Sequence, residues 1–303
     1  MGEVSRFLKR IEKHGLVHYK YYMIAPLGLL LLGIALLFCE TSKGAPLFIT
    51  DPWLDAVQPT CQTDDYDALY ENTSPKLEDV KAKIWFNNLT MVSEERIANV
   101  QEAAFNVISQ RVPGDFVETG VWKGGCSMLM RAVSRALNNT HCRASWLFDT
   151  FEGLPAMTAE DRRVELNLEE AGSLRAMDPE HSYSYEGGLE FVNRTMGEVL
   201  QSVGEDYKNL FLVKGLFKDT VHKARIRKIA VLRLDGDMYS STMEVLEALY
   251  DKVSPGGYVI IDDYGHWPQC KKAIHDFFDV QRGMDVGQLL VQVDYTGYFF
   301  IKP

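Results

Sequence analysis

Four aspartates closely follow two short aliphatic runs of this sequence. They are Asp235, Asp237, Asp262 and Asp263. Runs of β-branched and aliphatic residues that end abruptly in acids are typical of buried parallel strands, whose carboxyl ends lie at one edge of a sheet. Carboxylates gathered there raise one another's pKa unless a cation compensates, and oxygen ligands favour a hard ion such as Mg²⁺. The alternative interpretation is that Asp237 caps the following helix and that one of Asp262 and Asp263 is a solvated loop residue.

The two runs that carry these acids belong to a predicted strand-helix-strand unit. They cover residues 229–234 and 257–261, and residues 243–253 between them have apolar side chains at four-residue spacing. The sequence Pro255-Gly256-Gly257 ends that helix. A unit of this kind forms a parallel pair with a right-handed crossover, so the acids of both strands should face the same site.

A glycine turn predicts a second part of the site. The strand predicted at residues 115–119 contains Glu118 near its end, and Gly120, Gly124 and Gly125 follow before a helix begins. Glycines at such a turn allow a ligand to approach the backbone, although the pattern is not the G-x-G-x-x-G of dinucleotide-binding proteins. Glu118 would repel a pyrophosphate, but it can accept hydrogen bonds from the ammonium of an amino-acid-bearing cofactor such as S-adenosylmethionine.

Two neighbouring strands end in residues suited to a nucleoside. Asp149 ends the run 144–149, where its carboxylate could hold a ribose diol. Phe217 follows the run 209–215, where its ring could stack on an adenine or belong to the core.

Three further segments complete the predicted catalytic domain. Residues 94–110 predict a helix with Ser93 as its N-cap. Residues 288–293 and 298–301 predict an antiparallel hairpin that closes a methyltransferase-type sheet. Residues 156–190, acidic and loop-rich, predict an insertion that faces the substrate.

The N-terminal segment predicts a membrane anchor. Residues 21–39 form an uncharged, mostly aliphatic run that is long enough to cross a bilayer as a helix. Basic residues outnumber acidic ones ahead of it, so the positive-inside rule places residues 1–20 in the cytoplasm and the rest in a lumen. Residues 40–75, rich in proline and acids, then form a stem, and residues 76–303 form the catalytic domain. A cleaved signal peptide is the alternative.

Glycosylation patterns, charge and cysteines refine this prediction. Acceptor patterns begin at Asn72, Asn88, Asn138 and Asn193, and they support a luminal location if Asn138 and Asn193 lie on exposed loops. The formal net charge of -10 argues against a nucleic-acid partner. The five cysteines lack the spacing of zinc ligands, and Cys61 could join two chains as a homodimer.

Five segments resemble, in the same order, the macrocin O-methyltransferase family, sugar O-methyltransferases of macrolide and aminocoumarin biosynthesis. They are Val112–Gly125, Asp149–Pro155, Lys214–Thr220, Val231–Thr242 and Val253–Tyr264. The resemblance implies an α/β class I methyltransferase fold with a Rossmann-like, mostly parallel seven-stranded sheet. The transmembrane helix predicted ahead of it has no counterpart in the family. It also implies S-adenosylmethionine as the methyl donor and Mg²⁺ beneath an acceptor sugar.

The same resemblance implies roles for individual residues. The implied metal ligands are Asp235, Asp262 and Asp263, with Asp235 also the catalytic base. The implied cofactor contacts are Glu118, Thr119, Gly120, Gly124, Gly125, Asp149, Phe151, Gly215, Phe217 and Asp235. The segment after Pro155 diverges from the family, so the acceptor itself is not implied.

These observations together predict a type II membrane enzyme of the Golgi apparatus or endoplasmic reticulum. It would methylate a sugar hydroxyl on glycans, with Mg²⁺ chelated by neighbouring hydroxyls to ease loss of the proton. A luminal enzyme would need a transporter, because the charged donor does not cross a bilayer unaided. The alternatives are a small-molecule or lipid vicinal diol as acceptor, and an inactive membrane-tethered binding protein of the same fold. His266 is either an alternative base or a surface-loop histidine.

Overall fold

The computed structural model describes residues 47–48, 66–139, 142–170, 188–202 and 209–303. The predicted transmembrane run at residues 21–39 and most of the predicted stem lie outside these residues. Among the residues that are described, no helix is long and apolar enough to span a bilayer. Helix α2 (Tyr66–Phe86) begins within the predicted stem, so the boundary predicted at residue 76 falls inside a helix.

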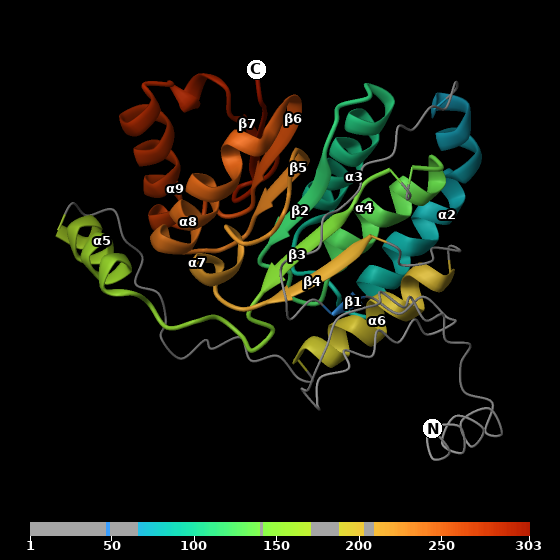
Figure 1. Cartoon of the computed structure of the whole chain (residues 1–303), viewed down its shortest axis with the longest axis horizontal. Helices are drawn as coiled ribbons and strands as arrows, with labels where there is room; N and C mark the ends of the chain where they lie inside the picture. Colours follow the sequence, from blue (N-terminus) through green and yellow to red (C-terminus); the bar gives the residue numbers. More distant parts are fainter. Residues whose placement is uncertain (1–46, 49–65, 140–141, 171–187, 203–208) are drawn as a thin grey trace, which may run out of the picture. The chain divides into compact units, whose positions relative to one another are not determined.

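The described strands form one mixed sheet in the order β1-β4-β3-β2-β5-β6-β8-β7 (Figure 1). Their bounds are β1 Leu47–Phe48, β2 Asp115–Thr119, β3 Ser145–Asp149, β4 Leu210–Lys214, β5 Ile229–Leu234, β6 Val253–Ile261, β7 Val291–Gln292 and β8 Tyr298–Ile301. Strands β1 to β6 pair in parallel, whereas β8 pairs antiparallel with both β6 and β7. The seven predicted strands and the closing hairpin are therefore confirmed, and β1 extends the edge beside β4.

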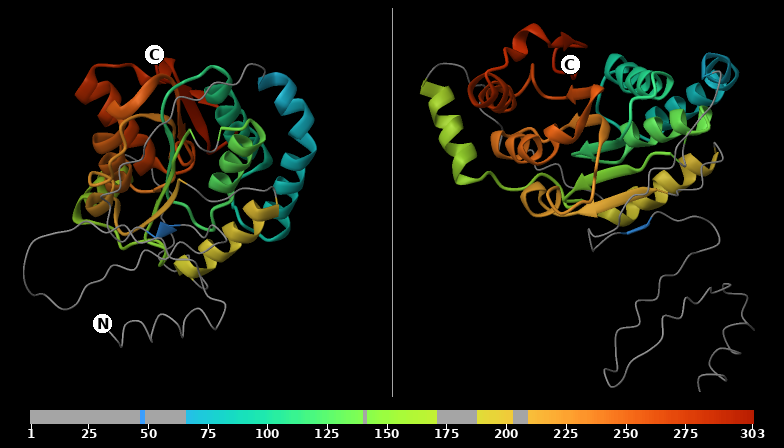
Figure 2. Two further views of the ribbon diagram at one scale, coloured as in Figure 1. Left: turned by 45° about the vertical axis from the view of Figure 1, so that its right-hand side comes forward. Right: turned by 45° about the horizontal axis from the view of Figure 1, so that its top comes forward.

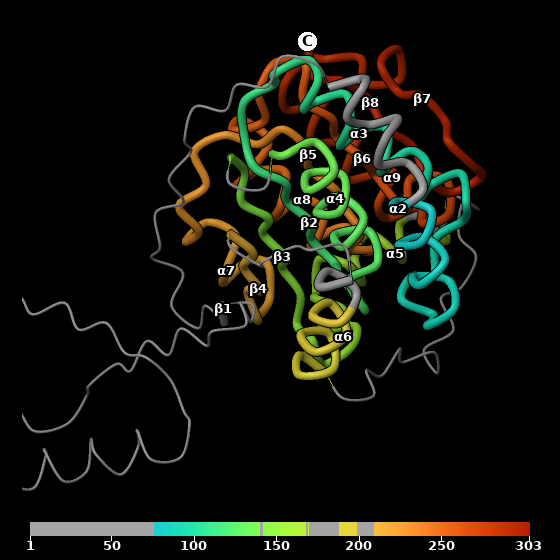
Figure 3. Tube along the Cα trace, turned by 90° about the vertical axis from the view of Figure 1, so that its right-hand side faces the viewer, coloured from blue at the N-terminus to red at the C-terminus, as the bar shows by residue number. Residues whose placement is uncertain are grey.

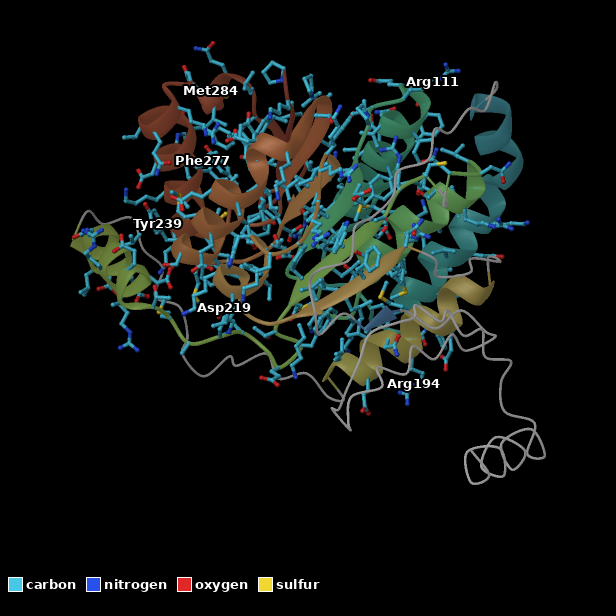
Figure 4. All side chains as sticks on the ribbon, in the orientation of Figure 1. Arg111, Arg194, Asp219, Tyr239, Phe277 and Met284 are labelled. Atoms are coloured by element: carbon cyan, nitrogen blue, oxygen red, sulfur yellow. The ribbon has the colours of Figure 1, made fainter. Side chains whose placement is uncertain are left out.

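Helices cover both faces of this sheet (Figure 2). Besides α2 they are α3 Glu94–Ser109, α4 Gly125–Ala136, α6 Gly188–Ser202, α7 Phe217–Thr220, α8 Tyr239–Leu249 and α9 Pro268–His275, whereas α5 Ala159–Glu170 packs against α8 and α9. One core contains side chains of α2, α3, α4 and α6, and α4 contacts α6 (Figure 3). The other contains side chains of α8 and α9, and Phe277 and Tyr239 pack there (Figure 4).

Residues of β2 show how the sequence divides these two cores. Phe116 packs into the core with α3 and α4, and the next residue, Val117, packs into the core with α8 and α9. Successive strand side chains point to opposite faces, so a strand covered by helices on both sides must be apolar throughout. This explains why the sequence runs that predicted strands are continuous rather than alternating.

Several predicted element boundaries differ from the structure. Helix α8 begins at Tyr239, before the predicted start at Met243, since the backbone N–H of Thr242 already donates to Met238 O at 3.2 Å. It ends at Leu249, and Pro255-Gly256-Gly257, predicted to end the helix, lie inside β6, which begins at Val253 rather than at residue 257. The segment predicted to be loop-rich at residues 156–190 contains all of α5. The predicted strand at 288–293 is reduced to β7, since a 3₁₀ turn ends at Gln288. Helix α3 and its cap at Ser93 are confirmed.

Candidate active site

A cavity of about 720 Å³ opens at the carboxyl ends of strands β2 to β6. Its lining includes most of the predicted cofactor contacts, namely Glu118, Gly120, Gly125, Asp149, Gly215, Phe217 and Asp235. Open parallel sheets place ligands at this edge, so the topology and the predicted residues agree.

Three predicted cofactor contacts are absent from the described lining of the cavity. The side chain of Phe151 belongs to the core with α4 and is 1% exposed. Thr119 is buried and donates its hydroxyl hydrogen to the backbone oxygen of Arg233. Gly124 leaves space for Met196, whose sulfur would lie 3.0 Å from an added Cβ. The structure thus gives these three residues contacts within the protein, which motif position alone does not reveal.

Gly120 is required where β2 and β5 end side by side. Its φ is +85°, and a Cβ built on it would lie 1.7 Å from the backbone oxygen of Asp235. The backbone N–H of Asp235 donates to Thr119 O at 2.9 Å, so the two chains cannot separate without losing this bond. The glycine therefore places Asp235 at the floor of the cavity.

Replacement of Gly120 by alanine should lower the free energy of unfolding by about 2–5 kcal/mol, because a strained φ is combined with overpacking against backbone. The matched control is Gly283→Ala, where φ is +63° and nothing lies within 4 Å of the added Cβ. That control should cost about 1–2 kcal/mol, the backbone penalty alone. Urea unfolding of both variants measures the difference, and equal midpoints would show that the close approach to Asp235 is unimportant.

Asp149 organises the glycine turn. Its Oδ2 accepts hydrogen bonds from the backbone N–H groups of Val121 at 2.7 Å and Trp122 at 3.1 Å, and Oδ1 accepts one from Phe151 at 2.7 Å. The Thr150 hydroxyl also donates to Oδ1 at 3.4 Å, so both oxygens of this carboxylate, which lines the cavity, take part in shaping the turn. The predicted position at the end of β3 is confirmed, and the role in holding the turn is additional.

The residue that sequence reasoning missed at the centre of the site is Arg233. Its side chain is 2% exposed, and it donates to Glu118 Oε1 at 2.9 Å, Asp235 Oδ2 at 2.7 Å and Asp262 Oδ1 at 2.5 Å. Burial raises the pKa of Glu118 to about 7, although Arg233 and the hydroxyl of Ser127 oppose that rise. One guanidinium thus joins the predicted cofactor carboxylate to the predicted metal site. An arginine within an otherwise aliphatic buried strand was the available signal, since such charges are normally paired.

The carboxylates that could hold a cation are Asp235, Asp237 and Asp263. One oxygen from each lies within 4.8 Å of the others. Burial and the neighbouring Asp235 raise the pKa of Asp237 to about 7. Burial and then Asp237 raise the pKa of Asp263 well above its usual range. Asp237 also has a left-handed backbone, with φ of 60°, a strained conformation that is common at functional sites.

Asp262 lies outside this cluster, although it was predicted to be a metal ligand. Its Oδ1 is paired with Arg233, and its Oδ2 with Arg96 of helix α3. Because each oxygen of Asp262 is paired with an arginine, Asp262 does not face the other acids. Asp237 is the third member of the cluster instead. The sequence brought all four acids to one edge, but it could not show which of them face arginines.

The predicted substrate-facing segment forms part of the cavity wall. Thr158 and Asp161 line the cavity at the start of α5. Asp161 is 1% exposed, and its Oδ1 accepts a hydrogen bond from the backbone N–H of Ser240 at 2.7 Å. A carboxylate at this position caps the N-terminus of α8 and thereby docks α5 beside the site.

Comparison with known proteins identifies the relatives of this chain. Residues 76–302 match the family described as Macrocin-O-methyltransferase (TylF). The chain is 39% identical over 214 residues to 8-demethyl-8-(2,3-dimethoxy-alpha-L-rhamnosyl)-tetracenomycin-C 4'-O-methyltransferase of Streptomyces olivaceus, with 70% of this chain and 74% of that protein covered. It is 36% identical over 225 residues to demethyldecarbamoylnovobiocin O-methyltransferase of Streptomyces niveus, with 71% and 76% covered.

Solved structures agree with this comparison. The O-methyltransferase NovP superposes with a TM-score of 0.57 at 35% identity, with 70% of this chain and 81% of NovP covered. The calicheamicin methyltransferase CalS11 has a TM-score of 0.54 at 18% identity, with 80% of this chain and 99% of CalS11 covered, and shows the shared fold. The fold and the site define a class I, S-adenosylmethionine-dependent O-methyltransferase. The chain belongs to the macrocin O-methyltransferase family, as the sequence motifs predicted.

The predicted location in the Golgi apparatus or endoplasmic reticulum is wrong. The relatives are enzymes of Streptomyces, bacteria that have neither compartment. The requirement for a luminal donor transporter and for secretory glycans depended on that location. The glycosylation pattern at Asn193 also lies within helix α6 with its side-chain oxygen buried, rather than on the exposed loop that the prediction required. The possible homodimer through Cys61 concerns a residue outside the described ones and stays a prediction.

Proposed function

We propose that this enzyme methylates a hydroxyl of a sugar, and that Asp235, Asp237 and Asp263 hold a divalent cation, Mg²⁺, beside that hydroxyl. The observation that carries the proposal is the meeting of three carboxylates in the cavity that Glu118, Asp149 and Gly120 also line. The name of the Streptomyces olivaceus relative, which contains a rhamnosyl group, supports a sugar as the acceptor class.

The residues present fit both the cation and the donor. Oxygens bound to one Mg²⁺ at about 2.0–2.1 Å lie about 3–4 Å apart. The three carboxylate oxygens lie within 4.8 Å of one another, so small side-chain rotations would bring them to that spacing. The cavity of about 720 Å³ is within the range of small-molecule sites. It offers Glu118 for an ammonium, Asp149 for a diol and Phe217 for a purine ring.

Asp235 has two tasks in the proposed reaction, as a ligand and as the base. A cation held by Asp235, Asp237 and Asp263 would lower the pKa of a neighbouring hydroxyl. Asp235 is the base that accepts the proton as the acceptor oxygen bonds to the methyl carbon, while the bond from that carbon to sulfur breaks with its electrons retained on sulfur. The Arg233 guanidinium holds Oδ2 of Asp235 at 2.7 Å, so the carboxylate is oriented before the acceptor arrives.

The full-length protein tests this proposal with isotope-labelled S-adenosylmethionine. The acceptors are methyl glycosides including methyl α-L-rhamnopyranoside, together with catechol and a monoacylglycerol. We expect label in a glycoside, loss of transfer in EDTA and recovery with excess Mg²⁺. Label in catechol or the lipid but in no glycoside would contradict the sugar assignment. Transfer that is unchanged by EDTA would contradict the cation.

The identity of the ligands is tested by metal titration. Asp237→Asn should weaken Mg²⁺ binding at least about tenfold in calorimetry, because it removes one of three ligands. Asp262→Asn is the matched control and should weaken it less, since its two oxygens already face Arg96 and Arg233. A larger loss in Asp262→Asn than in Asp237→Asn would restore Asp262 as the ligand that the sequence motif implied.

A further inference from the structure

The cavity contains three aromatic side chains besides the carboxylate cluster, and one of them, Trp267, donates a hydrogen bond to Asp237 of that cluster. His266 and Trp267 come from the loop between β6 and α9, and Tyr295 comes from the turn between β7 and β8. Donor-side residues follow β2, β3 and β4, whereas the acids follow β5 and β6. In the order of the sheet, the acids therefore lie between the donor side and Tyr295. We call the three rings the aromatic wall.

Tyr295 is held in place by its own turn. Its side chain is 68% exposed, so most of the ring surface can be reached by a ligand. Oδ1 of the preceding Asp294 accepts hydrogen bonds from the backbone N–H groups of Thr296 at 2.9 Å and Gly297 at 2.6 Å. These bonds fix the backbone on both sides of the exposed ring.

The same turn is hydrogen-bonded to Arg96 of α3, to its N-cap Ser93 and to Asp262, which follows β6. Oδ2 of Asp294 accepts from Ser93 Oγ at 2.7 Å and from Arg96 Nε at 2.9 Å. On the other side, Thr296 Oγ1 donates to the backbone oxygen of Asp262 at 2.8 Å. The ring is therefore held at a fixed position relative to the acids. Binding of a ligand to this ring then costs little conformational entropy of the protein.

Gly265 shows how closely the two loops of the aromatic wall approach. Its backbone N–H donates to Thr296 O at 2.8 Å, and a Cβ built on Gly265 would lie 2.0 Å from the backbone oxygen of Tyr295. Any larger residue at this position would move Tyr295 away from His266. The absence of a side chain at Gly265 therefore allows Tyr295 to lie at its observed position.

The rings of the aromatic wall leave faces open to a ligand. The Tyr295 hydroxyl lies 2.9 Å from Nδ1 of His266, and the two rings are perpendicular at 87°. His266 and Trp267 are also nearly perpendicular, at 78°. The contact with His266 is made through the hydroxyl at the tip of Tyr295, so His266 lies at the end of that ring rather than stacked on its face.

We propose that the aromatic wall is the acceptor subsite, and that a pyranose ring stacks through its C–H face on Tyr295. This inference rests on the proposed function. An aromatic face is the negative pole of the ring quadrupole and an apolar surface, so it suits the C–H face of a sugar. The ring hydroxyls would then point to the polar residues of the same cavity wall, Arg96 and Thr296. The hydroxyl that reacts reaches the acids deeper in the cavity.

Steady-state kinetics of the full-length protein test this subsite with methyl α-L-rhamnopyranoside as the probe. Tyr295→Ala should raise KM for the glycoside about tenfold, with KM for S-adenosylmethionine unchanged and kcat within about twofold. Tyr295→Phe keeps the ring and should stay within about twofold of the wild type. The matched control is Phe86→Ala, which removes a ring that is 88% exposed and absent from the described lining of the cavity.

Saturation-transfer NMR supplies a readout that does not require turnover. The ring C–H signals of the glycoside should be enhanced with wild type and Tyr295→Phe, and lost with Tyr295→Ala. If the NMR signals follow this pattern but no protein methylates the glycoside, the subsite is supported and the proposed reaction is rejected. Methylation with KM unchanged in Tyr295→Ala would overturn the subsite alone. A KM change seen for p-nitrophenyl α-L-rhamnopyranoside but not for the methyl glycoside would show that Tyr295 contacts an aglycone, and would also overturn the proposal.

Discussion

Arg233→Met should lower the free energy of unfolding by about 3–5 kcal/mol, because it leaves buried carboxylates without their counter-charge. Glu118 is 1% exposed and Asp262 is 7% exposed, and both receive hydrogen bonds from this one guanidinium. Arg233→Lys should recover only part of the loss. The ammonium of lysine lacks the planar set of donors by which the guanidinium reaches three carboxylates. Urea unfolding measures the change.

Two further variants make this prediction specific to the network. Arg163→Met removes an arginine that pairs with Glu160 on the exposed side of α5, and its unfolding midpoint should not change measurably. Arg233→Met combined with Asp262→Asn should be less destabilised than the sum of the two single changes, by about 0.5–3 kcal/mol. Strict additivity would mean that Arg233 stabilises by packing rather than by charge.

Local sequence signals predicted the fold because each strand has a physical reason to be apolar. Strands β2 to β6 are covered on both faces, so their runs stand out from the polar segments around them. Gly120 and Asp149 follow these runs directly, and the topology then places them at the correct edge. Residues attached to the ends of predicted strands were therefore found without the structure.

Other parts of the site depend on contacts between distant segments. Arg96 reaches Asp294 and Asp262 from a helix that lies far away in the chain, and nothing in its own segment marks it. Tyr295 was predicted only as part of a hairpin turn, although the bonds around it fix its ring at the cavity. Asp237 and Asp262 have similar positions after strands, and only the placement of the two arginines separates their roles. Such pairings are tertiary, so spacing cannot predict them.

Asp263→Asn should have opposite effects on activity and on the stability of the metal-free protein. Methyl transfer should fall by about 10²–10⁴-fold, because the cation that supports loss of the acceptor proton loses a ligand. In EDTA the variant should be more stable than the wild type by about 1–2 kcal/mol, since the buried member of three mutually repelling carboxylates becomes neutral. An asparagine oxygen can still accept the hydrogen bond that the backbone N–H of Asp237 donates to Asp263 at 3.2 Å.

Thermal unfolding with and without Mg²⁺ separates these effects. Mg²⁺ should raise the midpoint of the wild type by binding the folded state, and should raise that of Asp263→Asn less or not at all. Asp219→Asn is the matched control, because it neutralises an exposed acid at α7 that is absent from the described lining of the cavity (Figure 4). If Asp263→Asn were less stable than the wild type in EDTA, the carboxylates would not repel one another in the folded protein. The cluster would then be held by hydrogen bonds alone, and the case for a cation as its missing partner would fail.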